Sequence, residues 1–258
     1  MAKENYNSDL YRTGDTSKYL KNFLYGDKFH LKSGDILDEL NISYETYGNL
    51  NKDKSNVVLI CHAISGDSHV AKHDEEDIPG WWDIMVGPGK PIDTENYFVI
   101  CSNVIGGCKG STGPNSIDPS TGTHYGSNFP NITVEDMVSA QNLLIEHLGI
   151  KSILCVTGGS MGGMQSLQFC ATFPNRTFSA MPIACSTSHS AQNIALNELA
   201  RQAVMADPVW DKGKYIKQNT QPKNGLAVAR MVGHISYLSE KGMQEKFGRK
   251  LQEKADYE

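Results

Sequence analysis

The chain has 258 residues, of which 39% are hydrophobic and 21% charged, and its formal net charge is −5 at pH 7. This composition is that of a globular protein, and the length suffices for one large domain with an insertion. The acidic balance and the lack of a Lys/Arg cluster argue against a nucleic-acid partner, and apolar runs of only strand length argue against a membrane.

The first half of the chain predicts strands. Residues 1–25 are polar and irregular, which indicates a loosely held arm without a secretion signal. Residues 29–31, a turn at Gly34-Asp35 and the alternating segment 40–45 predict an antiparallel hairpin at a sheet edge, with one face buried. Four apolar runs then lack alternation, which is typical of strands in a parallel sheet covered by helices. These runs are 57–61, 97–101, 153–156 and 181–185.

Two helices are predicted among these strands. Thr133 and Asp136 have the spacing of a capping box, in which each side chain bonds the backbone N–H of the other residue, and Gly149 supplies the C-terminal stop. The second helix begins at Met161 and ends at about Phe173, before a proline. Strands that alternate with helices predict an α/β fold with a doubly wound, mostly parallel sheet.

The sequence Gly158-Gly159-Ser160-Met161-Gly162 joins run 153–156 to the second helix. It has the G-x-S-x-G pattern of a nucleophile elbow, in which the serine sits on a strained turn. Side chains in place of the outer two glycines would collide with the neighbouring strand and helix. We therefore predict Ser160 as a catalytic nucleophile, against the alternative of a plain turn. An edge hairpin, parallel strands and an elbow serine are the arrangement of an α/β-hydrolase.

From residue 188 the pattern changes to helices over 191–206, 223–238 and 240–255, with no strand between them. Helices inserted after the sixth strand are where this fold carries its lid. We therefore predict an α/β-hydrolase core at 1–187 and an incomplete helical lid region at 188–258. The last strands of the sheet are expected to be missing.

A nucleophilic serine needs a general base. The histidines after Ser160 are His189 and His234, both in the predicted lid, and the favoured interpretation is that the chain ends before the base and its acid. Residues 61–66 follow a central strand and predict the loop that carries one oxyanion donor, the other being the Met161 N–H. His62 lies in this loop, where a role in orienting the loop is favoured over one as the base.

Other features carry weaker hypotheses. Residues 106–114 are glycine-rich but lack the Gly-Lys-Ser/Thr order of a P-loop, which favours a structural or substrate-entry loop. His69 and His73 lie in the acidic stretch 67–77, where a solvated loop is favoured over a metal site because no periodicity sets ligand spacing. Arg201 and Arg230 lie among apolar residues, so each needs an internal or a substrate carboxylate. The six cysteines show no CxxC pair, which favours reduced thiols.

Several motifs together resemble the homoserine O-acetyltransferase family, and the resemblance extends from about residue 25 to 248. The elbow belongs to the longest of them, and further motifs stand in the loops and in the predicted lid. They are CHAISGD at 61–67, PGWW at 79–82, SNVIGGC at 102–108, GSTGP at 110–114, GGSMGGMQ at 158–165, SAQNIA at 190–195 and ARMVGHI at 229–235.

The resemblance implies a ping-pong acyl transfer for methionine biosynthesis. Ser160 would take the acetyl group from acetyl-CoA, and the hydroxyl of L-homoserine would remove it. The backbone N–H groups of Ile64 and Met161 are implied as oxyanion donors, Arg230 as the residue that binds the amino-acid carboxylate, and Tyr237 as part of the same pocket. The implied enzyme is cytoplasmic, uses no metal and no cofactor beyond acetyl-CoA as substrate, and forms a homodimer through its lid helices.

Members of this family continue with further strands, an Asp and a His that this chain lacks. The chain therefore resembles a C-terminally truncated member, and we expect little or no turnover from it alone. The alternatives left open are a homoserine O-succinyltransferase or serine O-acetyltransferase of the same family, a serine hydrolase in which water replaces homoserine, and a non-catalytic remnant.

Overall fold

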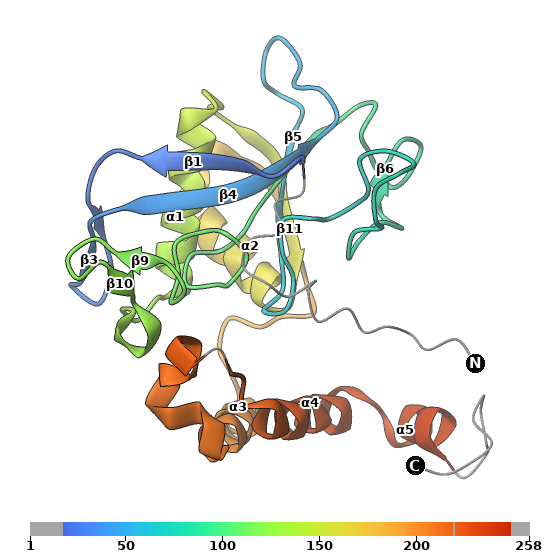
Figure 1. The fold of residues 1–258 in the computed structure, drawn as a ribbon. Coiled ribbons are helices and arrows are strands. Elements are labelled where there is room, and N and C mark those ends of the chain that lie inside the picture. The colour runs from blue at the N-terminus through green and yellow to red at the C-terminus, as the bar shows by residue number, and fades with distance from the viewer. Residues whose placement is uncertain (1–17, 219, 249–258) are drawn as a thin grey trace. The chain divides into compact units, whose positions relative to one another are not determined.

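The computed structural model describes residues 18–218 and 220–248. The chain divides into two compact units, Met1–Thr187 and Ser188–Glu258. Within these described residues, the first unit contains the strands and two α-helices, and the second contains helices (Figure 1).

A six-stranded sheet with the order β1-β4-β8-β5-β11-β12 forms the centre of the first unit. β1 pairs with β4 and β4 with β8 in antiparallel fashion, and the other neighbours are parallel. The sheet thus extends to both sides of β5, which confirms the doubly wound, mostly parallel fold. The strands are β1 (Lys21–Tyr25), β4 (Leu40–Tyr47), β5 (Val57–Cys61), β8 (Phe98–Ser102), β11 (Ile153–Gly159) and β12 (Thr177–Ile183).

The prediction for the first strands was partly wrong. Residues 1–17 lie outside the described residues, but Lys21–Tyr25 forms β1 instead of an arm. Its polar residues are compatible with a strand because β1 lies at the sheet edge and is mostly exposed. β2 (Phe29–His30) pairs with β3 (Ile36–Leu37) in a separate small sheet, and not with β4. β4 lies between β1 and β8 and is buried on both faces.

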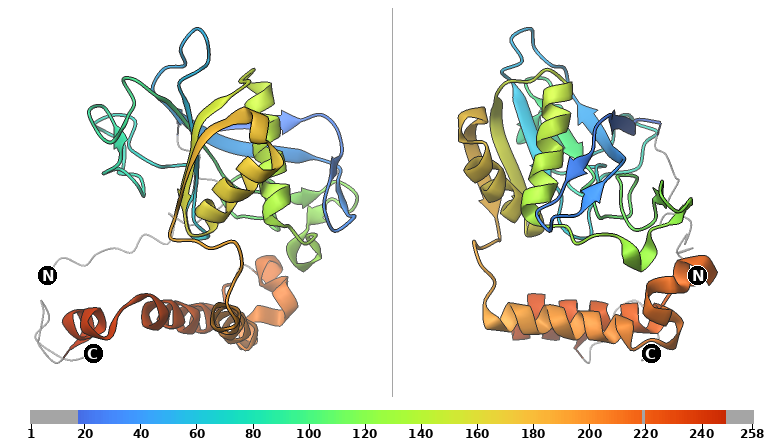
Figure 2. Two further views of the ribbon diagram at one scale, coloured as in Figure 1. Left: turned by 180° about the vertical axis from the view of Figure 1, so that it is seen from behind. Right: turned by 90° about the vertical axis from the view of Figure 1, so that its left-hand side faces the viewer.

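The two faces of the sheet are covered differently. Val57, Leu59 and Cys61 of β5 enter the hydrophobic cluster that contains residues of helices α1 (Val134–His147) and α2 (Met161–Thr172). These helices pack against each other on one face (Figure 2). Val58 and Ile60 point to the other face, where Val70, Val86 and Ile92 cover them. An irregular segment with the short strands β6 (Val86–Gly87) and β7 (Ile92–Asp93) thus covers a face for which we expected helices.

The predicted ends of the first helix are confirmed. Thr133 Oγ1 accepts the N–H of Asp136, and the Asp136 carboxylate accepts the N–H of Thr133 at 2.8 Å. Gly149 follows α1 with φ +66°, a left-handed conformation that suits glycine. The short strands β9 (Ile117–Asp118) and β10 (Thr123–His124) pair in the loop before α1. β12 begins four residues earlier than predicted, because its pairing with β11 already starts at Thr177.

The second unit contains α3 (Ala191–Met205), the 3-10 segment η4 (Pro208–Gln218), α4 (Lys223–Tyr237) and α5 (Glu240–Phe247). α3 packs closely on α4, because a Cβ atom on Gly225 would lie against the Ala203 carbonyl oxygen. The buried Asp207 carboxylate accepts the N–H groups of Gly225 and Val209 at 2.9 and 3.0 Å. The rest of the helix predicted to 255 lies outside the described residues. Among the described helices, none has the length and apolar character needed to span a bilayer.

Candidate active site

Ser160 stands between the end of β11 and the first residue of α2. Its backbone has φ 57° and ψ −121°, a conformation that costs a non-glycine residue about 1–3 kcal/mol. The Ser160 N–H donates to the Ile183 carbonyl of β12 at 3.0 Å, which holds the turn to the neighbouring strand. The side chain is exposed and does not cap α2, so the hydroxyl is accessible to a substrate.

The glycines around Ser160 are required by close backbone contacts. A Cβ atom on Gly158 or on Gly162 would lie closer than 3.0 Å to the carbonyl oxygen of Cys61. Cys61 ends β5, and the register of the two parallel strands pairs it with Gly158. Gly159 has no atom within 4 Å of the corresponding position. The outer two glycines of the motif therefore let the elbow pack against β5, as the sequence pattern predicts.

The loop after β5 begins beside the elbow because Cys61 and Gly158 are register partners. Within the described residues, the N–H groups of Ile64 and Met161 donate to no protein acceptor. Met161 is the first residue of α2, where backbone N–H groups lack intrahelical partners and the helix dipole favours negative charge. The arrangement supplies an exposed hydroxyl together with two unbonded N–H donors on the adjoining segments.

His62 is engaged at both ring nitrogen atoms. Nδ1 bonds the Ala63 carbonyl oxygen at 2.7 Å, and Nε2 accepts the Val104 N–H at 3.1 Å. Only the neutral tautomer with its proton on Nδ1 satisfies both bonds. Burial lowers the pKa of His62, which also favours the neutral ring. The imidazole therefore connects the loop after β5 to the end of β8, and neither nitrogen is available to take a proton from Ser160.

Gln165 of α2 holds the same loop from the other side. Its side chain is fully buried, and Nε2 donates to the carbonyl oxygens of His62 and Met161 at 3.2 and 3.3 Å. Oε1 accepts from Gln141 of α1 at 2.7 Å. Gln165 thus fixes the carbonyl groups that flank the candidate oxyanion donors. Gln165 belongs to the extended sequence motif around the elbow, which by itself indicates no role for this side chain.

A third set of bonds joins the loops after β5 and β8. The buried Asn103 side chain accepts the Ser68 N–H at 2.8 Å and donates to the Lys109 carbonyl. Ser111 Oγ donates to the Asn103 carbonyl and accepts the Ser43 N–H from β4. The glycine-rich segment 106–114 is therefore anchored to the sheet by several side chains.

The arginines and histidines predicted in the lid lie in the second unit. Arg201 forms an ion pair with Glu198 one turn earlier on α3, so its partner is an internal carboxylate. Arg230 is exposed on α4 and forms no salt bridge within the part of the chain that the structure describes. Tyr237 lies seven residues later, on the same face of α4, and its side chain is 85% exposed. His189 and His234 are exposed.

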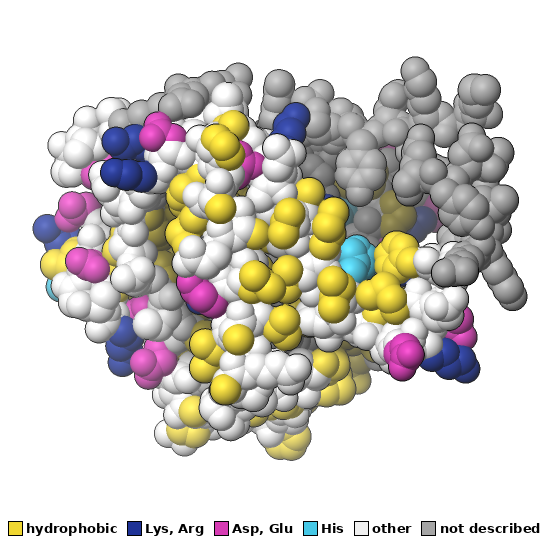
Figure 3. Space-filling view, turned by 90° about the horizontal axis from the view of Figure 1, so that it is seen from below, with side chains coloured by type: hydrophobic (Ala, Val, Ile, Leu, Met, Phe, Trp, Pro, Cys, Tyr) yellow, Lys and Arg dark blue, Asp and Glu magenta, His cyan; other side chains and the backbone are white. Residues whose placement is uncertain are grey.

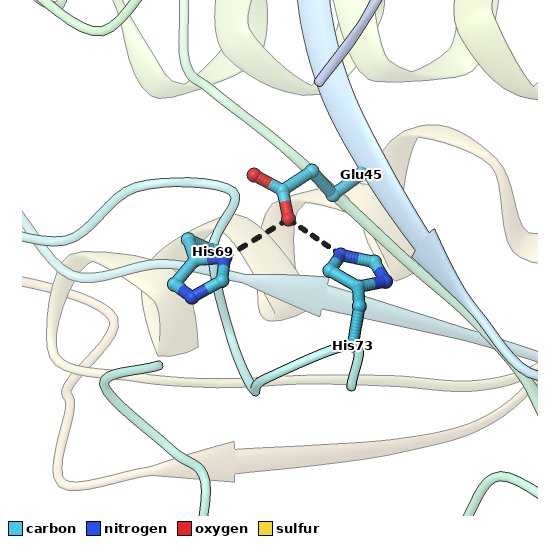
Figure 4. Close-up of side chains that lie close together, drawn as sticks. All are labelled: Glu45, His69 and His73. Atoms are coloured by element: carbon cyan, nitrogen blue, oxygen red, sulfur yellow. Dashed lines mark hydrogen bonds and ion pairs between the residues drawn. The ribbon is translucent and has the colours of Figure 1, made fainter. Parts of the chain in front are cut away.

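A buried cluster that the sequence analysis missed lies beside β4. Glu45 Oε2 is 3.1 Å from His69 Nδ1 and 2.8 Å from His73 Nε2 (Figure 4). The Glu45 side chain is 2% exposed, and the two histidine side chains are 15% and 12% exposed. The interpretation of residues 67–77 as a solvated loop was therefore wrong for these two histidines, although Asp74, Glu75 and Glu76 are exposed.

The electrostatics of the cluster follow from its hydrogen bonds. Burial raises the pKa of Glu45, but the bonds from His69 and His73 outweigh this effect and lower the pKa to about 2. The bond to Glu45 is the largest influence on His69 and raises its pKa to about 9, although burial acts in the opposite direction. His69 Nε2 also bonds the Ile78 carbonyl oxygen at 2.8 Å. The loop that follows residue 68 is thus tied to the sheet by charge-assisted bonds.

Comparison with known proteins finds the same fold and, among curated proteins, relatives of high sequence identity. The family described as the alpha/beta hydrolase fold matches residues 56–258. A curated protein of Nitrobacter hamburgensis, named homoserine O-acetyltransferase, is 60% identical over 225 residues, which cover 87% of this chain and 56% of that protein. The chain spans about half the length of the curated relatives it matches.

Two solved structures are similar over most of the chain. The crystal structure of homoserine O-acetyltransferase from Bacillus anthracis has a TM-score of 0.82 and 32% identity, and the match covers 91% of this chain and 65% of that one. The structure of esterase E22 has a TM-score of 0.78 and 33% identity, with coverages of 88% and 64%.

Proposed function

Because the chain belongs to the α/β-hydrolase fold family, we propose that it carries the nucleophile of an acyltransferase that moves an acetyl group from acetyl-CoA to the hydroxyl of L-homoserine. One observation carries the proposal. Ser160 stands exposed on a strained elbow next to the unbonded N–H of Met161, and the adjoining loop after β5 carries the unbonded N–H of Ile64, in a chain whose relatives are named homoserine O-acetyltransferase. The reaction would belong to methionine biosynthesis.

In the proposed mechanism, Ser160 Oγ loses its proton to a base and attacks the thioester carbonyl carbon. The oxyanion accepts hydrogen bonds from the N–H groups of Ile64 and Met161, and the CoA thiol leaves with a proton. The hydroxyl of L-homoserine then attacks the acetyl-serine and gives its proton to the base. Ser160 Oγ leaves and is reprotonated, so O-acetyl-L-homoserine and free enzyme result.

The base in this mechanism is not His62, whose two nitrogen atoms hold the loop. We propose that the complete protein supplies the base from the part of its relatives' length that this chain does not span, and that residues 1–258 alone have little or no turnover. The test is CoA release by both proteins with acetyl-CoA and homoserine. Release by 1–258 that Ser160→Ala abolishes would contradict the second proposal.

The acyl-enzyme itself is the direct test of the nucleophile. The complete protein incubated with acetyl-CoA alone is expected to gain one acetyl group on Ser160, which mass spectrometry of the peptide detects. Ser160→Ala is expected to abolish this adduct, whereas Ser120→Ala, on an exposed turn, leaves it unchanged. An adduct that persists in Ser160→Ala would overturn the proposal, and homoserine binding without any adduct would favour a non-catalytic protein.

The donor and acceptor are proposals that competition assays test. Acetyl-CoA and succinyl-CoA, each with homoserine or serine, are compared side by side, and acetyl-CoA with homoserine is expected to have the largest kcat/KM. The similarity to esterase E22 favours hydrolysis as the second candidate function. Acetyl-CoA consumption at the same rate without homoserine would support that candidate.

We propose that Arg230 binds the carboxylate of the acceptor bidentately and that Tyr237 lines the same pocket. Arg230 is exposed and forms no salt bridge among the described residues, which supports this role. Arg201, by contrast, is paired with Glu198. Arg230→Lys is expected to raise the KM for homoserine at least about tenfold with a smaller change in kcat, since a lysine loses the bidentate geometry. Arg201→Lys is the matched control, and equal effects in both variants would contradict the assignment.

The helices of the second unit support the proposal of a homodimer. Hydrophobic side chains gather over them (Figure 3), and large exposed ones lie on both α3 and α4. Apolar surface of this kind marks interaction sites. Met231→Glu is expected to shift the mass measured by light scattering from dimer to monomer, while Lys241→Glu leaves it unchanged. The exposed hydrophobic residues of α3 and α4 are Ile194, Leu199, Met205, Leu226, Val228, Met231, Ile235 and Tyr237.

We further propose a cytoplasmic location, which six free cysteines support.

A further inference from the structure

We propose that Glu45, His69 and His73 bind one divalent transition-metal ion of the zinc type, at a site independent of the acyl-transfer residues. One carboxylate oxygen and two imidazole nitrogen atoms lie within 4.8 Å of one another, and the site is empty. Two histidines and a carboxylate are a ligand set that zinc and similar ions use in proteins.

The direction of the ligand atoms supports a cation at this position. Both histidine nitrogen atoms point at the same oxygen, Glu45 Oε2 (Figure 4). The lone pairs of nitrogen and oxygen approach to 2.8 and 3.1 Å only with a hydrogen-bonding proton or a metal ion between them. In the metal-free protein an N–H hydrogen fills this place at each nitrogen. A metal ion that enters the cluster replaces these protons and uses the same lone pairs.

The surrounding residues orient the ligands as outer-shell partners do in metal sites. His69 Nε2–H donates to the Ile78 carbonyl at 2.8 Å, which leaves Nδ1 to face the site. The Tyr47 hydroxyl donates to Glu45 Oε2 at 3.0 Å while it accepts the Val70 N–H at 2.9 Å. These bonds therefore orient the carboxylate and one imidazole towards the site before an ion binds.

The His73 ring is held by stacking. It lies between the rings of Tyr19 and Tyr47, with centroid separations of 4.0 and 4.2 Å and interplanar angles of 19° and 14°. The stack lets the ring slide in its own plane but resists tilting, so the Nε2 lone pair remains directed at Glu45. A histidine held in this way loses little conformational freedom when it binds an ion.

The distances must adjust for tetrahedral coordination. Zinc with bonds of about 2.1 Å separates its ligand atoms by about 3.4 Å. Glu45 Oε2 lies 3.1 and 2.8 Å from the two nitrogen atoms and must move away from each. The two nitrogen atoms must also reach this spacing, and all three ligand atoms now lie within 4.8 Å of one another. Rotations of the glutamate and histidine side chains would provide these adjustments. Three protein ligands leave a fourth position for water. The partial exposure of His69 and His73 gives an ion a route of entry.

The test uses the protein freed of metal with a chelator and then titrated with Co(II), whose tetrahedral complexes absorb visible light. Wild type is expected to bind one equivalent, which Zn(II) displaces. His73→Phe keeps an aromatic ring between Tyr19 and Tyr47 but removes the ligand nitrogen, and it is expected to bind Co(II) at least 100-fold more weakly. His30→Gln removes an exposed histidine elsewhere and is expected to bind as wild type does.

A second readout does not depend on absorption. Zn(II) is expected to raise the Tm of wild type and of His30→Gln but not that of His73→Phe, because only a folded site binds the ion. If His73→Phe fails to fold, the wild-type titration alone decides, since a curve without an end point at one equivalent overturns the proposal. Equal Co(II) binding by wild type and His73→Phe would mean an adventitious ion only and would also overturn the proposal. Glu45, His69 and His73 would then be a hydrogen-bonded cluster without a metal.

Discussion

The carbonyl oxygen of Cys61 lies closer than 3.0 Å to the position that a Cβ atom on Gly162 would occupy. A methyl group there must push β5 and α2 apart. Gly162→Ala is therefore expected to lower the free energy of unfolding by about 3 kcal/mol, as overpacking against backbone does. Gly159→Ala meets no atom within 4 Å and is expected to have a much smaller effect. Chemical denaturation measures both, and equal losses would contradict the close contact.

The strained backbone of Ser160 is expected to lower the stability of the fold at the residue that carries the proposed function. Its φ of 57° is unfavourable for serine and available to glycine. Ser160→Gly is expected to raise the free energy of unfolding by about 1 kcal/mol while it removes the proposed nucleophile. Ser160→Ala also removes the proposed nucleophile but keeps the strain, so its stability should stay near that of wild type. Thermal unfolding compares the two, and a gain in Ser160→Ala as large as that in Ser160→Gly would contradict strain as the cause.

Because His62 is buried, the folded protein is expected to lose stability in mild acid. Burial lowers its pKa in the folded state below the usual 6.5, so the neutral ring stabilises the fold above that pH. As the pH falls from 6.5 towards the folded pKa, the unfolded chain binds a proton that the folded one does not, and stability decreases by up to about 1.4 kcal/mol per pH unit. Denaturation at pH 7.0 and 5.5 is expected to show a smaller difference in His62→Gln than in wild type. His124→Gln, on an exposed side chain, should retain the wild-type difference.

The bond from Gln165 to the His62 carbonyl indicates that the conformation of the loop after β5 depends on a residue of α2. Gln165→Leu preserves volume but leaves the buried His62 carbonyl and the Gln141 amide without their partner. We expect a loss of about 2 kcal/mol in unfolding free energy and, in the complete protein, a lower kcat. Gln168→Leu on the same helix, which removes an exposed bond to Thr172, is the control. Unchanged kcat in Gln165→Leu would show that the loop does not need this support.

The elements that sequence alone predicted well depend on local signals. The capping box at Thr133 and Asp136 lies within one turn, and the elbow within five residues, so both could be read directly. The pairing of β1 with β4 joins segments about twenty residues apart, and no local pattern marks Lys21–Tyr25 as a strand. The alternation of residues 40–45 places Glu45 among the polar positions of a strand with one buried face. Its partners His69 and His73 stand 24 and 28 residues further along in an irregular loop, where spacing carries no information about contact.

The bonds of His62 and Gln165 determine when the loop after β5 becomes ordered. Both form between segments of the first unit as it folds, one to the end of β8 and one to α2. The entropy of fixing residues 62–65 is therefore lost during folding and not at the encounter with an acyl donor. In the proposed reaction, a thioester at Ser160 would meet amide dipoles whose segment these bonds already orient as negative charge develops. Such pre-organisation acts on the reaction barrier itself, beyond any gain in affinity.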